Sequence, residues 1–395
     1  MLDACWPEGD NSMSAESLGS IVIISASRRT DIPAFHSEWL MNRLRAGYVL
    51  VRNPVAKNIV YRVDLSRRNV DCIAFITKNP MPLEPHLREI GSMGHIYTFQ
   101  VTLTPYSKDL EPGVPFKADI NDCCIRIADR IGRDRMTWRY DPVILNGRIG
   151  LDYHRRKFEM MCGEASQWTD RCIISFVDFY SKLSRVAEEG TIRAITREEK
   201  AAFARMAART ADEYGMTVTS CCAKEDLSEY GVINRPCMDA TTYRSLNIPY
   251  EVSSSPMRER CGCIRSIDIG EYDTCMHDCV YCYANRPDIE KRASKVYMPE
   301  SEMLWNCLTP RDQIVDLSTR EAARLGDYLR SEGLPVGRDP DLCDAIIVRD
   351  AAGSCPAVEC CRSSHDWNDA CGVFKPLRGR SPKVPKVAVV APLNK

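Results

Sequence analysis

Three cysteines, Cys275, Cys279 and Cys282, stand on one short stretch with the spacing C-x3-C-x2-C, next to Tyr281 and Tyr283. The spacing gathers three thiolates on one loop without an obvious fourth. A structural zinc site is usually closed by four ligands, whereas cysteine thiolates are the usual ligands of iron–sulfur clusters. A [4Fe–4S] cluster held by three cysteines keeps one iron open to a small molecule, so the spacing favours an iron–sulfur centre.

Zinc is the alternative at this loop, because His277 would complete a set of three cysteines and one histidine. The spacing is tight for one tetrahedral ion, since residues only two apart would have to turn towards the same metal. A third interpretation is that the stretch binds no metal.

A second group of cysteines precedes the loop. Cys261 and Cys263 form a Cys-x-Cys pair, and Cys222 and Cys237 lie upstream of it. These four thiols could form a second site, for zinc or for another cluster, with Cys221 as a substitute for its neighbour Cys222. The signal is less specific, because the pair is short and buried thiols are common in protein cores.

The bulk composition is that of an ordinary globular protein. The 395 residues include 53 basic and 54 acidic side chains and 20 cysteines, and 44% are hydrophobic. The balanced charge does not favour nucleic-acid binding, and no apolar stretch approaches the ~20 residues of a membrane-spanning helix. Because the first residues lack a hydrophobic signal core, we expect a cytoplasmic protein whose cysteines are metal ligands or buried thiols rather than disulfides.

Short apolar stretches alternate with helical ones from residue 21 to about 223. The expected strands are apolar on both faces, as parallel strands covered by helices are; they lie at 21–25, 48–51, 72–76, 96–103, 135–139, 172–177 and 217–222. Helices are expected at 37–46, 83–93, 118–131, 151–162 and 197–214. About seven such repeats predict an α/β fold, a TIM-like (β/α) barrel that is complete or partial, with a doubly wound sheet as the alternative.

Composition shifts divide the chain into four segments. We expect a disordered extension over 1–19, the barrel over 20–260, a cysteine-rich metal- or cluster-binding segment over 261–311 and an accessory, partly disordered tail over 312–395. The tail is rich in Gly, Pro and Ser, which disfavours a packed core. Its first part, 312–332, has the pattern of one amphipathic helix.

Polar side chains gather where the expected strands end, which is where β/α barrels carry their functional groups. They are Arg28, Arg29, Asp31, Arg52, Lys78, Arg139, Asp141 and Asp178. The cations would suit a carboxylate or a phosphate, and the aspartates would balance them and act as acids or bases. The alternative is a rim of structural ion pairs. Four histidines are expected to be structural or surface residues: His36, His86, His95 and His154.

Several motifs, in order along the chain, resemble an uncharacterised bacterial family known only as a domain of unknown function. They are I-S-A-S-R-R-T-D-I-P-A-F from residue 24, V-R-N-P from 51, T-K-N-P from 77, W-R-Y-D-P from 138, D-L-S-E-Y-G from 226 and S-I-D-I-G from 266, running into the cysteine loop. The resemblance covers about residues 20–310.

The cysteine loop by itself resembles the cluster loop of radical S-adenosylmethionine (radical SAM) enzymes, in particular the spore photoproduct lyase branch. The resemblance implies that Cys275, Cys279 and Cys282 hold a [4Fe–4S] cluster that chelates S-adenosylmethionine and releases a 5′-deoxyadenosyl radical, with Tyr281 near the adenine. In that superfamily the loop follows the first barrel strand, whereas here roughly 270 residues precede it. A circularly permuted barrel, with a strand at 266–269 beside the strand at 21–25, would reconcile the two orders.

The leading hypothesis is therefore a radical SAM-like iron–sulfur enzyme that acts on a small anionic substrate and takes electrons from a flavodoxin or ferredoxin. A nucleic-acid substrate is implied by the photoproduct lyase branch alone and gains nothing from the net charge. Two alternatives remain open. One is a non-radical hydrolase or lyase with structural zinc or cysteine sites, and the other is a metal-binding or redox-sensing protein without turnover.

Overall fold

The computed structural model describes residues 21–54, 56–177, 187–221, 223, 225–246, 248, 262–285, 297–305 and 307–317. It also gives the backbone of β12 (Ala345–Val348) and β13 (Val387–Val390), which pair in parallel. The expected extension at 1–19 and most of the expected tail lie outside the described residues, so the division into four segments stays a prediction.

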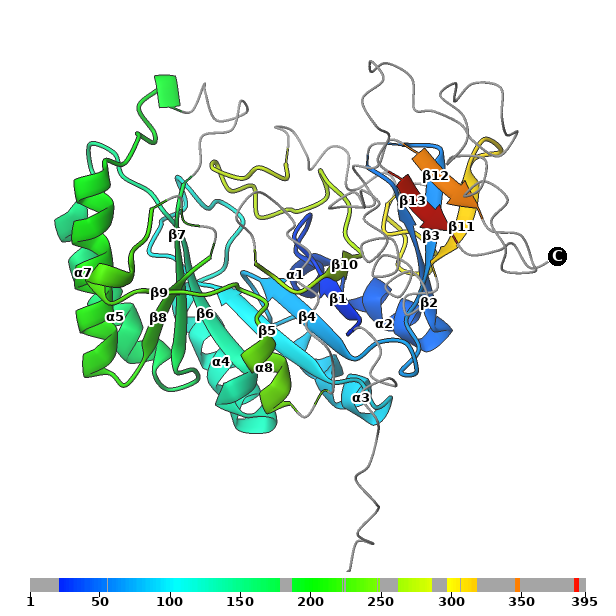
Figure 1. Ribbon diagram of the computed structural model, residues 1–395, viewed down its shortest axis with the longest axis horizontal. Coiled ribbons are helices and arrows are strands. Elements are labelled where there is room, and N and C mark those ends of the chain that lie inside the picture. The colour runs from blue at the N-terminus through cyan, green and yellow to red at the C-terminus, as the bar shows by residue number, and fades with distance from the viewer. Residues whose placement is uncertain are drawn as a thin grey trace, which may run out of the picture.

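An eight-stranded parallel sheet forms the body of the fold (Figure 1), in the order β10-β1-β4-β5-β6-β7-β8-β9. Its strands are β1 (Ile23–Ala26), β4 (Cys72–Thr77), β5 (Tyr97–Thr102), β6 (Met136–Val143), β7 (Arg171–Phe176), β8 (Thr217–Ser220), β9 (Ile233–Asn234) and β10 (Ser266–Asp268). The α/β class is confirmed. Within the described residues, however, β10 and β9 are edge strands, so the sheet is open and a closed TIM-like barrel is not confirmed.

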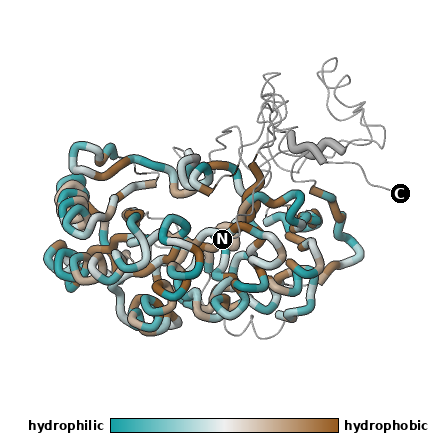
Figure 2. Tube along the Cα trace, turned by 90° about the horizontal axis from the view of Figure 1, so that it is seen from below, coloured by the Kyte–Doolittle hydropathy of each residue, from teal (hydrophilic) through white to brown (hydrophobic). Residues whose placement is uncertain are grey.

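Helices follow most strands of this sheet. They are α1 (Ile32–Phe35), α2 (Ser37–Ala46), α3 (Leu87–Ser92), α4 (Lys117–Ile131), α5 (Leu151–Ala165), α7 (Arg197–Glu213) and α8 (Ala240–Ser245), with 3-10 turns at Glu84–His86, Arg133–Arg135 and Ser228–Tyr230. Hydrophilic and hydrophobic residues alternate around their turns (Figure 2), as expected of helices that cover a sheet with one face. Of the helices in the described residues, none has the length and apolar character needed to cross a membrane.

The ends of α7 are encoded locally. The Thr196 hydroxyl accepts a hydrogen bond from the backbone N–H of Glu199, and the Glu199 carboxylate accepts one from the backbone N–H of Thr196. This reciprocal capping box satisfies two N–H groups that have no partner within the helix. Gly215 follows the helix with a φ of 67°, a conformation that glycine adopts without a steric penalty. The predicted helix at 197–214 is confirmed.

The two faces of the large sheet are covered differently. Alternate strand residues belong to the main hydrophobic core, among them Ile24, Phe75, Phe99, Trp138 and Ile174. Trp138 stacks on Phe158 of α5 with ring centroids 5.1 Å apart, which places the helix layer on this face. The opposite face carries Ile23, Ala74 and Ile173, which cluster with Tyr243 of α8. Only part of this second face is therefore covered by apolar packing, and the rest carries polar side chains.

A separate three-stranded sheet contains two segments that differ from the sequence-based predictions for residues 48–51 and 312–332. Strands β2 (Tyr48–Arg52) and β3 (Ile59–Asp64) form an antiparallel hairpin, and β11 (Gln313–Leu317) pairs in parallel with β3. The stretch 48–51 is thus a strand but not a strand of the large sheet, because a short loop permits only antiparallel pairing with the next strand. Residues 313–317 form a strand rather than part of a helix over 312–332, since edge pairing with β3 overrides helical periodicity.

The strand expected at 266–269 lies where the permuted order requires it. β10 pairs in parallel with β1, with Ile24 opposite Ile267, and β1 lies between β10 and β4. This pairing is confirmed even though closure of a barrel is not. The carboxyl ends of parallel strands share one edge of a sheet. The cysteine loop, which follows β10, therefore lies at the same edge as the loops that follow β1 and β4.

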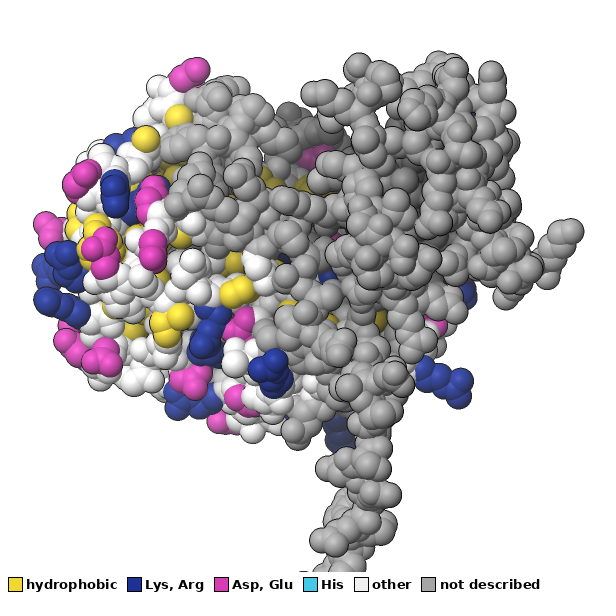
Figure 3. Space-filling view, in the orientation of Figure 1, with side chains coloured by type: hydrophobic (Ala, Val, Ile, Leu, Met, Phe, Trp, Pro, Cys, Tyr) yellow, Lys and Arg dark blue, Asp and Glu magenta, His cyan; other side chains and the backbone are white. Residues whose placement is uncertain are grey.

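The described residues on the face shown in Figure 3 do not form a surface of predominantly positive or predominantly negative charge. On the face shown in Figure 3, Lys and Arg side chains are interspersed with Asp and Glu side chains over the described part of the chain. Such mixing does not produce the basic stripe that a nucleic-acid backbone attracts.

Candidate functional site

One cavity of about 560 Å³ lies at the carboxyl ends of the strands of the large sheet. Its volume is in the usual range of small-molecule sites. Most of the residues predicted for the site line it, namely Arg28, Arg29, Asp31, Lys78, Arg139, Asp141, Cys237, Cys263, Cys275, Cys279, Tyr281 and Cys282. Segments that are far apart in the sequence are thus brought to one place.

Four predicted residues are not among these. Arg52 ends β2 in the small sheet and forms an ion pair with Asp312, with Nη2 and Oδ2 2.8 Å apart. Arg52 therefore does not line the cavity, because β2 belongs to the small sheet, although it acts together with Arg29 on the carboxylate of Glu271. Asp178, Cys222 and Cys261 lie outside the described residues, and their roles stay predictions.

Asp31 connects three segments around the cavity. Its carboxylate accepts hydrogen bonds from the backbone N–H of Ala34 (3.0 Å), the hydroxyl of Thr77 (2.7 Å) and the backbone N–H of Lys78 (2.7 Å). The Nε2 atom of His277 lies 2.8 Å from its Oδ2. Asp31 therefore fixes the cysteine loop against the chain that follows β1 and β4.

His277 does not complete a ligand set with the loop cysteines. Its Nε2 faces Asp31, and its Nδ1 lies 3.3 Å from the carbonyl oxygen of Gly113. Both ring nitrogens are thus engaged with protein oxygens. This geometry disfavours the alternative of a zinc site with three cysteines and His277.

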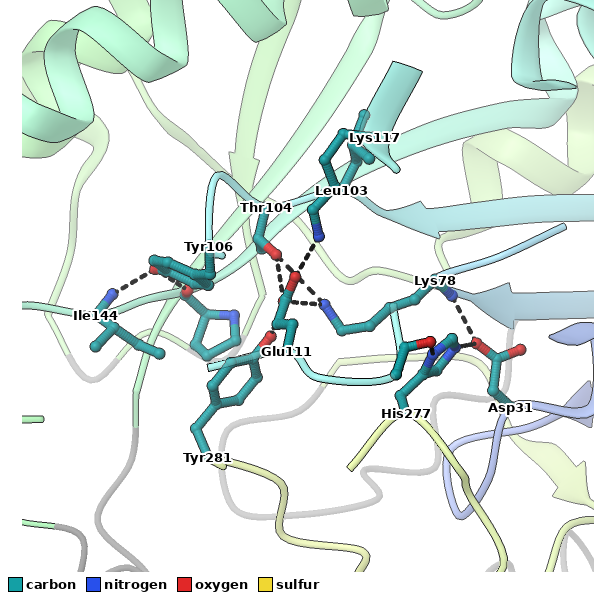
Figure 4. Close-up of polar contacts among 12 residues, drawn as sticks. Asp31, Lys78, Leu103, Thr104, Tyr106, Glu111, Lys117, Ile144, His277 and Tyr281 are labelled. Atoms are coloured by element: carbon teal, nitrogen blue, oxygen red, sulfur yellow. Dashed lines mark hydrogen bonds and ion pairs between the residues drawn. The ribbon is translucent and has the colours of Figure 1, made fainter. Parts of the chain in front are cut away.

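Glu111, which no motif indicated, is a buried carboxylate on the loop between β5 and α4 (Figure 4). It accepts hydrogen bonds from the Lys78 ammonium at 2.7 Å and from the Thr104 hydroxyl at 2.5 Å, and it also contacts the Lys117 ammonium and the Tyr281 hydroxyl. Burial alone raises the pKa of Glu111, but the two ammonium groups outweigh it and lower that pKa to about 2. Its partners Lys78 and Tyr281 belong to motifs that lie far from Glu111 in the sequence, so no sequence spacing indicated this residue.

Asp268 at the end of β10 holds the loop that follows β1. Its carboxylate accepts hydrogen bonds from the Ser27 hydroxyl (2.7 Å), the backbone N–H of Arg28 (2.7 Å) and the backbone N–H of Gly270 (3.0 Å). A Cβ atom at Gly270 would lie 2.0 Å from the Ser27 hydroxyl oxygen. The motif S-I-D-I-G thus supplies an aspartate and a glycine that bind the β10 end tightly to β1.

The cations of the cavity are balanced by carboxylates. Arg28 pairs with Asp268 through Nε at 3.2 Å, and Lys78 pairs with Glu111. Arg139 and Asp141, both on β6, form a third pair. Burial opposes ionisation of both members of that pair, but their mutual attraction raises the pKa of Arg139 and lowers the pKa of Asp141. All three pairs therefore remain charged at neutral pH.

The cysteine loop is docked on the loop that carries Glu111. The backbone N–H of Gly113 donates to the carbonyl oxygen of His277 at 2.9 Å, and a Cβ at Gly113 would lie 2.3 Å from the carbonyl oxygen of Met276. Only glycine allows this approach. Burial raises the pKa of Cys279 to about 12, although the ammonium of Lys78 opposes that rise.

The second cysteine group forms a tighter cluster than the loop does. Among the described residues, only Cys221, Cys237 and Cys263 bring three ligand atoms of the metal-binding type within 4.8 Å of one another. The sulfur of Cys263 lies 3.8 Å from that of Cys221 and 3.4 Å from that of Cys237. Cys221, the expected substitute for Cys222, thus belongs to this cluster, whereas Cys222 lies outside the described residues. These three close thiols can bind a metal ion.

The histidines expected to be structural lie away from the cavity. His36, His95 and His154 are buried, His86 is half-buried, and none of these four lines the cavity. The ring of His154 bridges the Tyr140 hydroxyl (2.7 Å from Nδ1) and the carbonyl oxygen of Ile144 (2.8 Å from Nε2).

Residues 23–284 match the family described as Domain of unknown function (DUF1848). The chain belongs to this family. The DUF1848 region begins in β1 and ends two residues after Cys282, so it contains every residue that lines the cavity. Among curated proteins, none matches the sequence.

Proposed function

We propose that this DUF1848 protein is an iron–sulfur enzyme of the radical SAM type, whose [4Fe–4S] cluster is held by Cys275, Cys279 and Cys282. The observation that carries the proposal is that these three thiols, from one short loop, line a single cavity together with charged groups of the strand ends. A cluster binds each thiolate through a different iron, so its ligands stand farther apart than those of one ion. The three loop sulfurs do not all lie within 4.8 Å of one another, which is compatible with ligands on different irons.

The surroundings of the loop suit such a cluster. The backbone N–H of Ala284 donates to the sulfur of Cys282 at 3.4 Å, and the Lys78 ammonium acts electrostatically on Cys279. Hydrogen bonds and positive charge near the sulfurs stabilise thiolate ligands and tune the cluster. When bound and reduced by the electron donor, the cluster would supply the one electron that cleaves the sulfonium of S-adenosylmethionine.

We infer that the substrate is a small polar or anionic molecule. The cavity has the volume for one, and Arg28 keeps 27% of its side chain exposed although it is paired with Asp268. A guanidinium held on one edge by a carboxylate can still bind a second anion on another edge. Asp31 and Asp141 are the proposed acid–base groups, Tyr281 is proposed to contact the adenine, and a flavodoxin or ferredoxin is the proposed electron donor.

The test is anaerobic reconstitution of the purified chain with iron and sulfide, followed by reduction in the presence of S-adenosylmethionine. We expect a broad brown absorbance and release of 5′-deoxyadenosine, both lost in the variant Cys275→Ala/Cys279→Ala/Cys282→Ala. Cys162→Ala is the matched control, because Cys162 is a buried free thiol of α5 that does not line the cavity.

Two other outcomes would contradict the proposal. Zinc at the loop without the brown absorbance would favour a non-radical enzyme with structural metal sites. A cluster that forms but never releases 5′-deoxyadenosine would favour a metal-binding or redox-sensing protein, the candidate that the close spacing of Cys221, Cys237 and Cys263 also supports.

A further inference from the structure

We propose that Cys221, Cys237 and Cys263 bind one tetrahedral zinc ion that ties together the two edges of the open sheet. This site is distinct from the cysteine loop and does not depend on the proposed reaction. The spacing of the sulfurs, the segments that carry them and the charge around them all favour such an ion.

The spacing of the three sulfurs decides between one ion and a cluster. Zinc–sulfur bonds of about 2.3 Å in a tetrahedron place two thiolates about 3.8 Å apart. The sulfur of Cys263 lies 3.8 Å from that of Cys221 and 3.4 Å from that of Cys237, and the three lie within 4.8 Å of one another. The side chains therefore already stand at the separations of a mononuclear site. Sulfurs that ligate different irons of a cluster must lie farther apart.

The three cysteines come from segments at opposite edges of the sheet. Cys221 directly follows β8, which lies next to the edge strand β9, and Cys263 precedes β10, the other edge strand (Figure 1). Cys237 follows β9. One ion bound to all three would connect the β8–β9 edge to the β10 edge, where a closed barrel would have a ladder of backbone hydrogen bonds.

The chain between β9 and β10 shows how the two edges approach each other. The carbonyl oxygen of Cys237 accepts a hydrogen bond from the Gln100 amide of β5 at 2.7 Å, which places this segment over the middle of the sheet. The next carbonyl, that of Met238, accepts one from the backbone N–H of Ile264 at 3.0 Å. The segment thus crosses the second face of the sheet, the one that carries Gln100, and meets the chain that enters β10. A metal at Cys237 and Cys263 stands at this crossing.

The charge around the cluster suits a metal–thiolate centre. Cys221 and Cys263 are buried and Cys237 is half-buried, and three thiolates cannot stand this close together without a cation between them. Zinc with three thiolates carries one net negative charge. Arg139 interacts with the sulfur of Cys237 and can offset that charge. A single pair of cysteines in a disulfide would leave the third sulfur unexplained.

The test measures zinc in the full chain, purified without added metal, and records zinc X-ray absorption. We expect about one equivalent of zinc with a first shell of at least three sulfurs at about 2.3 Å. A shell of four sulfurs would place a fourth cysteine on the ion, and a shell of three with one light atom would place water or a cavity ligand there; both support the site. A shell with two or fewer sulfurs, or a Cys237–Cys263 disulfide in mass spectrometry, would overturn it.

The variant Cys263→Ala should weaken zinc affinity by at least about tenfold, since even loss of an outer partner of a ligand costs that much. Cys162→Ala is the control and should keep the zinc. The triple variant of the cysteine loop should also keep it, so failure of the proposed cluster and failure of this site are distinguishable. If Cys263→Ala does not fold, the sulfur count measured in the triple variant of the cysteine loop still decides, because that variant has no loop thiols to bind zinc.

Discussion

Glu111 links the strand side of the cavity to the cysteine loop. Its single carboxylate receives Lys78 from the end of β4, Lys117 from α4 and Tyr281 from the cysteine loop (Figure 4). The side chain is only 1% exposed, so water cannot replace any of these partners. The position of Lys78 in the cavity therefore depends on a residue that does not itself line it.

The variant Glu111→Gln should lower the free energy of unfolding by about 3 kcal/mol at pH 7, because removing one partner of a buried ion pair leaves an uncompensated charge. The folded-state pKa of about 2 lies below the usual 4.5. The contribution of the carboxylate is thus complete above pH 4.5 and is lost as the pH falls towards 2. Urea unfolding at pH 7 and at pH 3 should show the difference between the two proteins shrinking at the lower pH.

Glu89→Gln is the matched control, because Glu89 pairs with Arg45 at the surface, where both side chains are well exposed. Exposed ion pairs contribute little to stability, and we expect no resolvable change. An equal effect of the two substitutions, or an effect of Glu111→Gln that does not depend on pH, would contradict the role given to Glu111.

At the scale of elements, the sequence predicted those strands and helices that repeat with a clear period. The helix at 37–46 and the parallel strands around it were found within a few residues, because apolar runs and helical spacing encode them locally. The strand at 48–51 was predicted, but β3 was not, so its antiparallel pairing with β2 across a short loop was missed. The strand β11 was taken for a helix because its partner, β3, lies more than two hundred residues upstream.

The cap of α7 is a local signal that can be tested by itself. Thr196→Ala removes the hydroxyl that accepts from the backbone N–H of Glu199, and should lower the free energy of unfolding by about 1 kcal/mol. Thr196→Asn keeps an acceptor and should retain most of the stability. Denaturant unfolding of the three proteins measures this, and equal stabilities would show that the box contributes nothing.

Docking of the cysteine loop depends on Gly113. In Gly113→Ala the new Cβ would lie 2.3 Å from the carbonyl oxygen of Met276 and 2.8 Å from the Cα of His277, so the loop must shift. We expect a lower iron content after reconstitution with the overall fold retained in circular dichroism. Gly91→Ala is the control, because a Cβ there meets nothing within 4 Å. Equal iron contents would mean that this contact does not position the loop.

At the scale of the whole molecule, an open parallel sheet brings two groups of cysteines and three ion pairs to one cavity. The sequence predicted the strand ends that meet there, since the β/α alternation fixes which end of each strand is shared. It could not predict the partners of those side chains. Asp268 and Glu111, which pair with Arg28 and Lys78, approach only because β10 joins β1 and because the β5–α4 loop folds back.

We propose that Cys275, Cys279 and Cys282 together hold a [4Fe–4S] cluster with one iron open to S-adenosylmethionine. Electron paramagnetic resonance of the reconstituted, reduced protein tests it most directly, recorded before and after S-adenosylmethionine is added. We expect the signal of a reduced [4Fe–4S] cluster that changes shape on addition and that is absent from the triple alanine variant. A signal that ignores S-adenosylmethionine, or one that persists in the triple variant, would contradict it.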